Sequence, residues 1–445
     1  MSSDVVGAAP TRREIVSWAV WDWGSAAFNA VIVTFVFSVY LTEAVGDDLP
    51  GSISATTWLA WSVGIASFLV AVLAPVSGQR FDATGSRKRS LAVLTAGTVV
   101  TMAAMSLVVD DYHYLWLGLV LLAVGSVLFE LSQVPYFAML RQVSTPESIG
   151  RVSGFGWSMG YFGGIVLLLI CYVGFIAGSG DTRGLLGLST EGGTNIRLVA
   201  VFAAVWFAVF AIPCLLAVPE VPRTGADPGA AQAGFLESYR VLWRDVRAMW
   251  AQDRGTVHFL IASALFRDGL NGVFLFGAVL AVNVYGIADD DVLLFGVAAN
   301  VVAALGAVGA GLLDDRLGPK IVIIVSLSSM IVLGAILLAV SGPGAFWVVG
   351  LLLCLFVGPA QSASRSFMAR LSPPGREGQM FGLYATTGRA VSFLAPMLFG
   401  LFAYLFAADR AGIIGLVIVL AIGLAALLPV PAPRDDVSPG AAATR

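Results

Sequence analysis

The chain has 445 residues, of which 58% are hydrophobic and only 12% are charged, and its formal net charge is −3. A soluble globular protein carries about 25% charged residues, so this composition excludes that class. The small net charge gives no sign of a nucleic-acid partner. The sequence therefore predicts an integral membrane protein.

Long apolar blocks run through the whole chain, separated by short segments rich in glycine, proline and charge. Each block approaches or exceeds the roughly 20 residues that a helix needs to cross the hydrocarbon core of a bilayer. In chain order the blocks cover residues 15–45, 53–77, 90–109, 114–141, 150–177, 196–218, 256–285, 291–313, 319–340, 344–371, 378–407 and 411–430. The pattern predicts an all-α membrane protein with twelve transmembrane helices.

Basic residues concentrate in alternate connections between the blocks. Arginine and lysine fill residues 87–89, and Arg240 and Arg244 follow the sixth block, whereas the first connection is acidic at Asp47 and Asp48. The positive-inside rule then predicts that both termini are cytoplasmic. Lysine is almost absent beside arginine, a bias common in GC-rich bacterial genomes. We therefore expect a multi-pass protein in the inner (cytoplasmic) membrane of a bacterium. We also expect it to be a monomer.

The longest polar connection divides six blocks from six. We predict an N-terminal six-helix bundle at 1–218, a cytoplasmic linker with an amphipathic helix at 219–255, and a C-terminal six-helix bundle with a short cytoplasmic tail at 256–445. Within the linker, large apolar residues recur at helical spacing beside arginines: Phe235, Tyr239, Leu242, Trp243, Val246, Met249 and Trp250, with Arg240, Arg244 and Arg247. We expect this helix to lie on the membrane surface. A soluble helix packed on the loops is the alternative.

The two halves of the chain repeat each other. Gly78, Asp82, Gly85 and Arg87 recur with the same spacing as Gly311, Asp315, Gly318 and Lys320. A second set, Gln133, Pro146, Gly154 and Gly160, recurs as Gln361, Pro374, Gly382 and Gly388. The repeats indicate two six-helix bundles of common ancestry.

These motifs resemble those of a known family. GQRFDATGSRKR at 78–89 resembles the GxxxDxxGxRxx signature of the major facilitator superfamily, and GLLDDRLGPK at 311–320 resembles its second copy. Four further stretches, at 21–46, 151–164, 267–286 and 361–396, look like the vacuolar amino-acid effluxer branch, whose eukaryotic members are autophagy-related. The resemblance covers nearly the whole chain. It implies the major facilitator fold, secondary transport and small zwitterionic solutes such as amino acids; Glu130 departs from it, since a neutral polar residue is expected there.

The repeated glycine and aspartate motifs are expected to act as gates. Asp82 and Asp315 can accept backbone hydrogen bonds at the N-terminus of a neighbouring helix, while basic residues bridge the ends of the halves. The predicted gating set is Gly78, Asp82, Gly85, Arg87, Gly311, Asp315, Gly318 and Lys320. A tight turn with solvated charges is the alternative.

Charged residues inside the apolar blocks are few and balanced, with Asp22, Glu130 and Asp268 against Arg267, Arg365 and Arg389. A charge at the centre of a transmembrane helix costs at least about 2.5 kcal/mol on insertion scales, so such groups usually face the interior of the bundle. With polar and aromatic residues near them, they define a candidate substrate or coupling site: Asp22, Asn29, Glu130, Gln133, Trp157, Tyr161, Asp268, Asn271, Gln361, Arg365 and Arg389. Structural pairing of the charges is the alternative.

We predict that the protein is a secondary active transporter that works by alternating access. Arg389 and Arg365 are the expected clamps for a substrate carboxylate, because guanidinium binds carboxylates in bidentate fashion and stays charged. Glu130 and Asp268 are the expected partners of an ammonium group or a proton when their arginine partner is engaged elsewhere. Proton coupling is thus a hypothesis. Two other functions stay open: a lipid or hydrophobic-drug exporter, and a transport-inactive receptor or scaffold.

Enzyme chemistry finds no support in the sequence. Neither lysine, Lys88 or Lys320, ends a GxxxxGK[ST] phosphate loop, and the histidines, His113 and His258, form no HExxH pair. We therefore predict no enzymatic activity, catalytic residue, metal site or cofactor. The expected partners are a small-molecule substrate and the lipid bilayer.

Overall fold

The computed structural model describes residues 9–220 and 234–433. Parts of the predicted linker (221–233) and C-terminal tail (434–445) lie outside the described residues. Within the described ranges, twelve helical segments are long and apolar enough to cross a membrane, from Arg12–Glu43 to Asp409–Leu427. This confirms the predicted fold class.

The first six spans form one half of the molecule. They comprise α1 (Arg12–Ala26), the π-helical η1 (Ala27–Phe35) and α2 (Phe37–Glu43), then α3 (Ala55–Thr84), α4 (Arg87–Ala104) with η2 (Met105–Leu107), η3 (Tyr112–Tyr114), α5 (Leu115–Ala138) with η4 (Met139–Arg141), α6 (Ile149–Cys171) with η5 (Tyr172–Ile176), η6 (Glu191–Gly193) and α7 (Thr194–Ala217). A short antiparallel hairpin of β1 (Thr182–Arg183) and β2 (Leu188–Ser189) precedes the sixth span.

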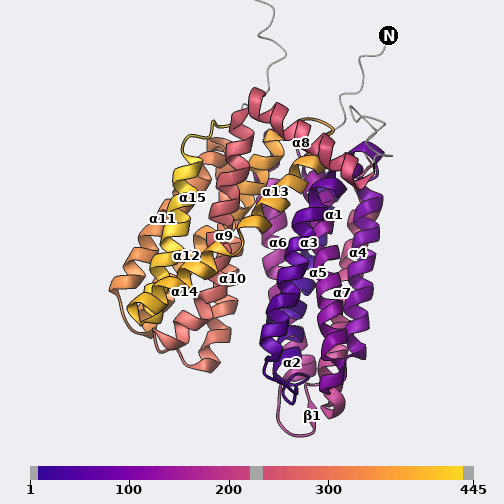
Figure 1. Cartoon of the computed structure of the whole chain (residues 1–445), viewed down its shortest axis with the longest axis vertical. Coiled ribbons are helices and arrows are strands. Elements are labelled where there is room, and N and C mark those ends of the chain that lie inside the picture. The colour runs from indigo at the N-terminus through magenta and orange to yellow at the C-terminus, as the bar shows by residue number, and fades with distance from the viewer. Residues whose placement is uncertain (1–8, 221–233, 434–445) are drawn as a thin grey trace, which may run out of the picture.

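The other six spans follow α8 (Phe235–Gln252) and form the second half. They are α9 (Arg254–Asn283), α10 (Asp289–Leu317), α11 (Pro319–Ala339), α12 (Pro343–Leu371), the broken span of α13 (Glu377–Val391) and α14 (Leu394–Phe406), and α15 (Gly412–Leu427), which η7 (Asp409–Ala411) precedes. In Figure 1 the two halves stand side by side, meet at the end that carries α8 and diverge toward the opposite end.

Local sequence explains several of the helix boundaries. Thr11 and Glu14 form a capping box that starts α1, each side chain accepting the backbone N–H of the other residue. α3 ends at Gly85, whose φ of +63° is a left-handed conformation that glycine adopts without strain. Gly318 takes a positive φ of +83° before Pro319, which occupies the first turn of α11. The motif glycines therefore set where these spans end and begin.

Glycine also allows the halves to pack closely against each other. A Cβ atom on Gly78 in α3 would collide with the carbonyl oxygen of Gly378 in α13. A Cβ atom on Gly154 in α6 would collide with the carbonyl oxygen of Ala307 in α10. Small residues thus permit the two main seams, α3 with α13 and α6 with α10.

Candidate functional site

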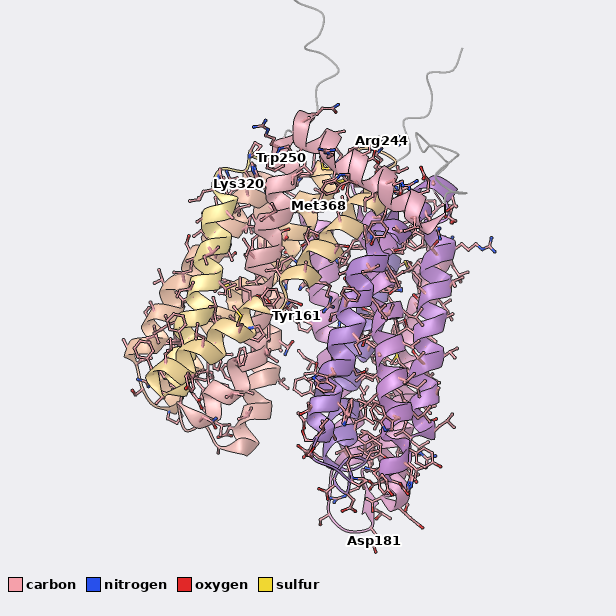
Figure 2. All side chains as sticks on the ribbon, viewed as in Figure 1. Tyr161, Asp181, Arg244, Trp250, Lys320 and Met368 are labelled. Atoms are coloured by element: carbon pink, nitrogen blue, oxygen red, sulfur yellow. The ribbon has the colours of Figure 1, made fainter. Side chains whose placement is uncertain are left out.

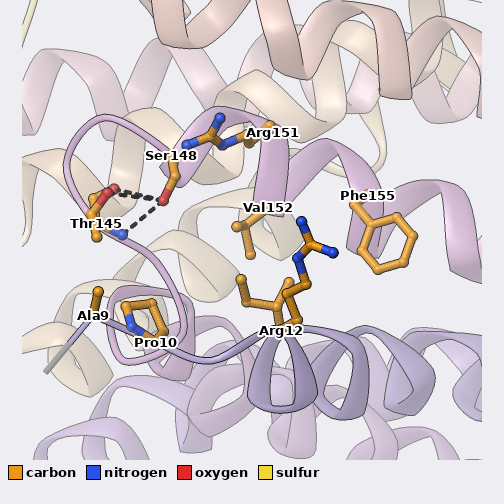
Figure 3. Close-up of a pocket in the computed structure, with 9 residues that line it drawn as sticks. Ala9, Pro10, Arg12, Thr145, Ser148, Arg151, Val152 and Phe155 are labelled. Carbon is orange, nitrogen blue, oxygen red and sulfur yellow. Dashed lines mark hydrogen bonds between the residues drawn. The ribbon is translucent and has the colours of Figure 1, made fainter.

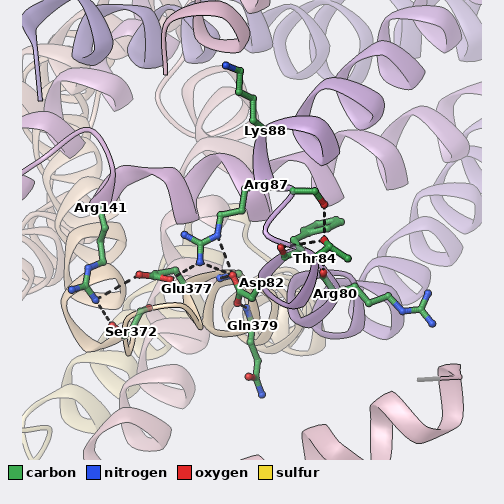
Figure 4. A network of polar contacts seen from close by, with 12 residues as sticks. Arg80, Asp82, Thr84, Arg87, Lys88, Arg141, Ser372, Glu377 and Gln379 are labelled. Carbon is green, nitrogen blue, oxygen red and sulfur yellow. Dashed lines mark hydrogen bonds and ion pairs between the residues drawn. The ribbon is translucent and has the colours of Figure 1, made fainter. Parts of the chain in front are cut away.

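We call the end of the bundle that carries Gly85 and Gly318 the latch end. The first latch joins α3 of one half to α13 of the other. The Asp82 carboxylate accepts the backbone N–H groups of Gly378 at 3.0 Å and Gln379 at 2.8 Å, at the positive end of the α13 dipole. Arg87 donates to Asp82 at 2.6 Å and to Glu377 at 2.5 Å, so it bridges the halves (Figure 4).

The second latch repeats the first with the halves exchanged. Asp315 of α10 accepts the backbone N–H groups of Gly150 at 2.7 Å and Arg151 at 3.3 Å, where α6 begins. Its neighbour Asp314 is buried and pairs with Arg370 of α12. The contacts that the sequence predicts for Asp82 and Asp315 are therefore present, and their role as gates stays a proposal.

The prediction that Lys320 bridges the two halves is wrong. Its ammonium group donates to the carbonyl of Leu428 at 2.8 Å, within the same half. The reason is local: α11 starts at Pro319 and packs against α15, so a residue in its first turn meets the end of that helix. In the second latch, Arg151 spans the halves instead, with its Nε 3.6 Å from Asp315.

A sealed ion pair joins the halves next to the latches. Arg365 of α12 donates through Nη1 to the Asp22 carboxylate of α1 at 3.1 Å, and the two side chains are 1% and 12% exposed. Its Nε and Nη2 donate to the hydroxyl and the carbonyl of Ser153 in α6, at 3.0 and 2.6 Å. An arginine of the second half is thus held by two helices of the first.

Aromatic rings complete the enclosure of Arg365. The centre of its guanidinium group lies 5.0 Å from the ring centroids of Trp18 and Trp157 and 5.1 Å from that of Phe137. These distances allow cation–π attraction. Gly156 makes room for the enclosure, because a Cβ atom there would stand 2.6 Å from the Trp18 ring and 3.0 Å from Arg365.

A second ion pair between the halves is more open. Arg389 of α13 pairs with Glu130 of α5, and the two side chains are 32% and 26% exposed. Arg389 lies in the last turn of α13, next to the break in its span. Its guanidinium group is therefore paired and still accessible.

Asp268 and Arg267 hold the broken span, which corrects the expected arginine partner of Asp268. The Asp268 carboxylate accepts the N–H of Ala395 in the first turn of α14 at 2.6 Å, and among the described residues it forms no ion pair. Arg267 projects from a different face of α9. The centre of its guanidinium group lies 3.8 Å from the centroid of the Tyr384 ring, and it donates to the Tyr384 carbonyl at 3.2 Å. Adjacent residues of α9 thus bind both parts of the break, since successive helical side chains point about 100° apart.

The remaining predicted residues differ in the contacts that they make. Tyr161 lies between the halves in Figure 2, and its ring centroid is 6.3 Å from that of Phe274 in α9. Gln361 donates to Asn271 at 3.5 Å within the second half. The buried Oε1 of Gln133 has no hydrogen-bond partner among the described residues.

Asn29 is more exposed than the polar residues Asp22 and Ser25 that precede it in the first span. Asp22 and Ser25 are buried in α1, but Asn29 is exposed and lies in the π-helical segment η1. A π-helix changes the angle between successive side chains, so the spacing of an α-helix does not carry over to Asn29.

A cavity of about 590 Å³ lies between the starts of α1 and α6 (Figure 3), and no member of the Arg365–Asp22 or Arg389–Glu130 pair lines it. It is lined by Arg12, Arg151 and mainly apolar or hydroxyl side chains. None of the predicted substrate residues lines it. Within the described residues no group of three histidine, cysteine, aspartate or glutamate side chains is placed to hold a metal ion.

Sequence analysis missed several partners in these networks. Ser153, Tyr136 and Trp18 surround Arg365, and Glu377 and Arg370 take part in the latches. The doubled aspartate at 314–315 and the Arg376–Glu377 pair at the start of a span were visible signals of charge near the latch end. The serine and the aromatic residues carry no comparable signal, because such residues are common in transmembrane helices.

Comparison with known proteins fits this geometry. The family model described as "Vacuole effluxer Atg22 like" matches residues 141–438, more than half of the chain. The chain belongs to the Atg22-like effluxer family. It is 24% identical over 416 residues to the uncharacterized MFS-type transporter YxiO of Bacillus subtilis, covering 93% of this chain and 94% of that protein. It is 24% identical to autophagy-related protein 22 of Cryptococcus neoformans over 62% of this chain and 52% of the fungal protein.

Solved structures place this Atg22-like chain in the major facilitator fold. The proton:xylose symporter XylE superposes with a TM-score of 0.69 at 17% identity, covering 94% of this chain and 96% of that one. The human organic anion transporter MFSD10 gives a TM-score of 0.70 at 13% identity, covering 94% and 100%. The matched family and fold are those of multi-pass membrane transporters.

Proposed function

We propose that the protein moves a small carboxylate-bearing or zwitterionic, amino-acid-like solute by alternating access, coupled to protons. In this proposal the halves at 1–218 and 256–445 move as units, and the latch end faces the cytoplasm with both termini, in the inner membrane of a bacterium. Among the described residues, the hydrogen bonds and ion pairs that join the halves lie toward the latch end. The state described here is then the one closed to the cytoplasm.

The observation that carries the proposal is the partly exposed pair of Arg389 and Glu130. A guanidinium group that is already paired with a carboxylate is suited to a substrate carboxylate, because the two anions make the same bidentate contacts. Its exposure gives a solute access that the sealed Arg365 does not offer in this state. We therefore assign the first capture of substrate to Arg389.

Charge balance then favours a zwitterion or an accompanying proton. When a substrate carboxylate takes Arg389, Glu130 loses its cation inside the membrane, where an unpaired charge is unfavourable. The ammonium group of an amino acid can replace the lost partner, or a proton can neutralise the carboxylate. Either outcome links substrate binding to the charge of Glu130.

We assign Arg365 and Asp22 to the step that follows capture of the substrate by Arg389. Separation of the latches would free Arg365 from Asp22 and expose it to the same solute from the cytoplasmic side. We propose that the nearby polar and aromatic residues, Asn29, Gln133, Trp157, Tyr161, Asn271 and Gln361, line the route between the two arginines. Asp268 is assigned to holding the broken span, since its carboxylate is engaged by α14.

The first experiment identifies a ligand and then tests the pair. A thermal-shift panel of amino acids, peptides, nucleosides, sugars and lipids on the purified protein finds compounds that bind the folded state. Uptake of the best ligand is then measured in proteoliposomes with and without an imposed pH gradient. We expect Arg389→Ala to abolish binding and Glu130→Gln to abolish the response to the gradient.

Matched controls remove the same charges from exposed positions. Arg89→Gln and Glu147→Gln should leave binding and the pH response unchanged. If Arg389→Ala binds the ligand as the wild type does, or Glu130→Gln keeps gradient-driven uptake, the pair is structural and the proposed mechanism is wrong. A response confined to lipids would favour the lipid-exporter alternative.

A further inference from the structure

The helix α8 crosses the seam between the two halves at the latch end (Figures 1 and 2). The Tyr239 hydroxyl donates to the carbonyl of Val72 in α3. Asp245 accepts from the Gln379 side chain at 3.1 Å and lies 3.7 Å from Arg376, where α13 begins. One face of α8 is therefore bound to both partners of the first latch.

The opposite face of α8 is exposed and combines arginine with large apolar side chains. Leu236, Trp243 and Trp250 are 75%, 64% and 45% exposed. At about 100° per residue, Arg240 and Arg247 fall on the same face as these apolar residues. The Arg247 guanidinium lies 6.0 Å from the Trp243 ring centroid.

Charge on this outer face is predominantly positive. Arg240, Arg244 and Arg247 are exposed, and among the described acidic residues of α8 Glu237 pairs with Arg240 at 3.4 Å while Asp245 turns toward α13. An exposed patch of this size on a docked helix needs a partner that is both anionic and apolar. The membrane that holds the protein offers such a surface in its anionic phospholipids.

The depth of α8 supports this partner. Val72 precedes the last residue of α3, Thr84, by 12 positions, which corresponds to roughly 18 Å along the helix axis. Tyr239 therefore reaches alongside α3 and does not cap its end. Asp245 of the same helix meets Arg376 and Gln379 where α13 begins. α8 therefore runs beside the ends of the spans, where amphipathic helices meet the boundary between headgroups and acyl chains and where tryptophan is enriched.

We propose that the outer face of α8 binds the headgroups of anionic phospholipids through Arg240, Arg244 and Arg247, with Trp243 and Trp250 in the interface. Bound lipid holds α8 across the seam and so stabilises the state in which the latch end is closed. This second step rests on the proposed alternating access. It follows because a ligand favours the state that it binds better, and α8 contacts both halves only while they are together.

Binding is tested by photocrosslinking, which does not depend on transport. The full-length protein is placed in nanodiscs of phosphatidylcholine with a trace of photoreactive phosphatidylglycerol, and crosslinked peptides are mapped by mass spectrometry. We expect crosslinks on residues 235–252 that unlabelled phosphatidylglycerol competes away. Each arginine near an anionic surface contributes roughly fivefold in affinity, so R240Q/R244Q/R247Q should remove most of them.

A matched variant, R12Q/R13Q/R89Q, removes the same charge from exposed positions at the same end of the protein. It should keep the crosslinks on α8. The lipid site is overturned if the crosslinks lie elsewhere, if phosphatidylcholine competes equally, or if both triple variants lose them alike.

The effect of bound lipid on closure of the latch end is tested by measuring the distance between the two halves. Nitroxide labels at Val93→Cys and Leu317→Cys, one exposed position in each half, report the separation of the halves near the latch end. In an equal mixture of phosphatidylcholine and phosphatidylglycerol we expect a shift toward the shorter distance relative to phosphatidylcholine alone. That shift should vanish in R240Q/R244Q/R247Q and persist in R12Q/R13Q/R89Q. Crosslinking to α8 without any shift would overturn the coupling and leave the lipid site standing.

Discussion

Two of the ion pairs that join the halves of this transporter, Arg365 with Asp22 and Arg389 with Glu130, differ in their surroundings. Arg365 and Asp22 are sealed among aromatic rings and Ser153, so nothing can replace either partner while the latch end is closed. Arg389 and Glu130 are about a third and a quarter exposed, and a solute can compete for either. The same chemistry therefore suits a gate in one place and a binding site in the other. Burial decides which.

The largest expected effect comes from breaking the sealed pair on one side only. Arg365→Gln leaves Asp22 buried without its cation, which typically destabilises a protein by about 3–5 kcal/mol. We expect a lower melting temperature and, in labelled protein, a shift toward longer distances at the latch end. The double variant Asp22→Asn with Arg365→Gln should recover much of the loss, because no unpaired charge remains. A double variant as unstable as the single one would show that the pair is not what seals this region.

The latches should show an intermediate effect that separates gating from binding. A carboxylate at a helix N-terminus stabilises by about 0.3–1 kcal/mol and by up to about 2 kcal/mol when partly buried. Asp82→Asn and Asp315→Asn should therefore lower turnover while leaving substrate affinity nearly unchanged, with Asp82→Asn the more severe because Asp82 forms a buried ion pair with Arg87, whereas the Arg151 partner of Asp315 is 57% exposed. Transport rates and binding measured on the same variants check this. Lost binding with unchanged turnover would contradict the gating role.

Loss of the Asp268 contact with the broken span should have a smaller effect. Asp268→Asn keeps an acceptor for the Ala395 N–H but loses the charge at the helix end, about 0.3–1 kcal/mol. Asp268→Ala loses the acceptor too, for about 0.5–2 kcal/mol. Because Arg389 lies next to the break, we expect Asp268→Ala to raise KM more than Asp268→Asn does. Equal KM values in the two variants would show that the contact between Asp268 and Ala395 does not affect substrate binding.

The smallest effect on stability is expected at the open pair. An ion pair open to solvent contributes about 0–1 kcal/mol, so the double variant Glu130→Gln with Arg389→Gln, which leaves no unpaired charge, should barely change the melting temperature although it changes transport. Thermal denaturation of this double variant beside Arg365→Gln tests the comparison directly. If the open pair proves as important for stability as the sealed one, exposure does not distinguish a gate from a binding site here.

The sequence by itself determined the architecture and the latch contacts. Span number follows from the lengths of apolar blocks, and the twofold plan follows from the repeated motifs; both are local patterns. The contacts of Asp82 and Asp315 were also predictable. Each aspartate lies near the end of a span that stops at a glycine, where its carboxylate can accept the free N–H groups at the N-terminus of a neighbouring helix.

Only the tertiary structure decided which charges meet. Asp22, Glu130 and Asp268 carry the same group in similar apolar surroundings, yet they bind an arginine sealed in aromatic rings, an accessible arginine and the first turn of a helix. These outcomes depend on how each helix is rotated, on the break between α13 and α14 and on the π-helical segment in the first span. Long-range packing sets those features, so no pattern within a single span can specify the partners.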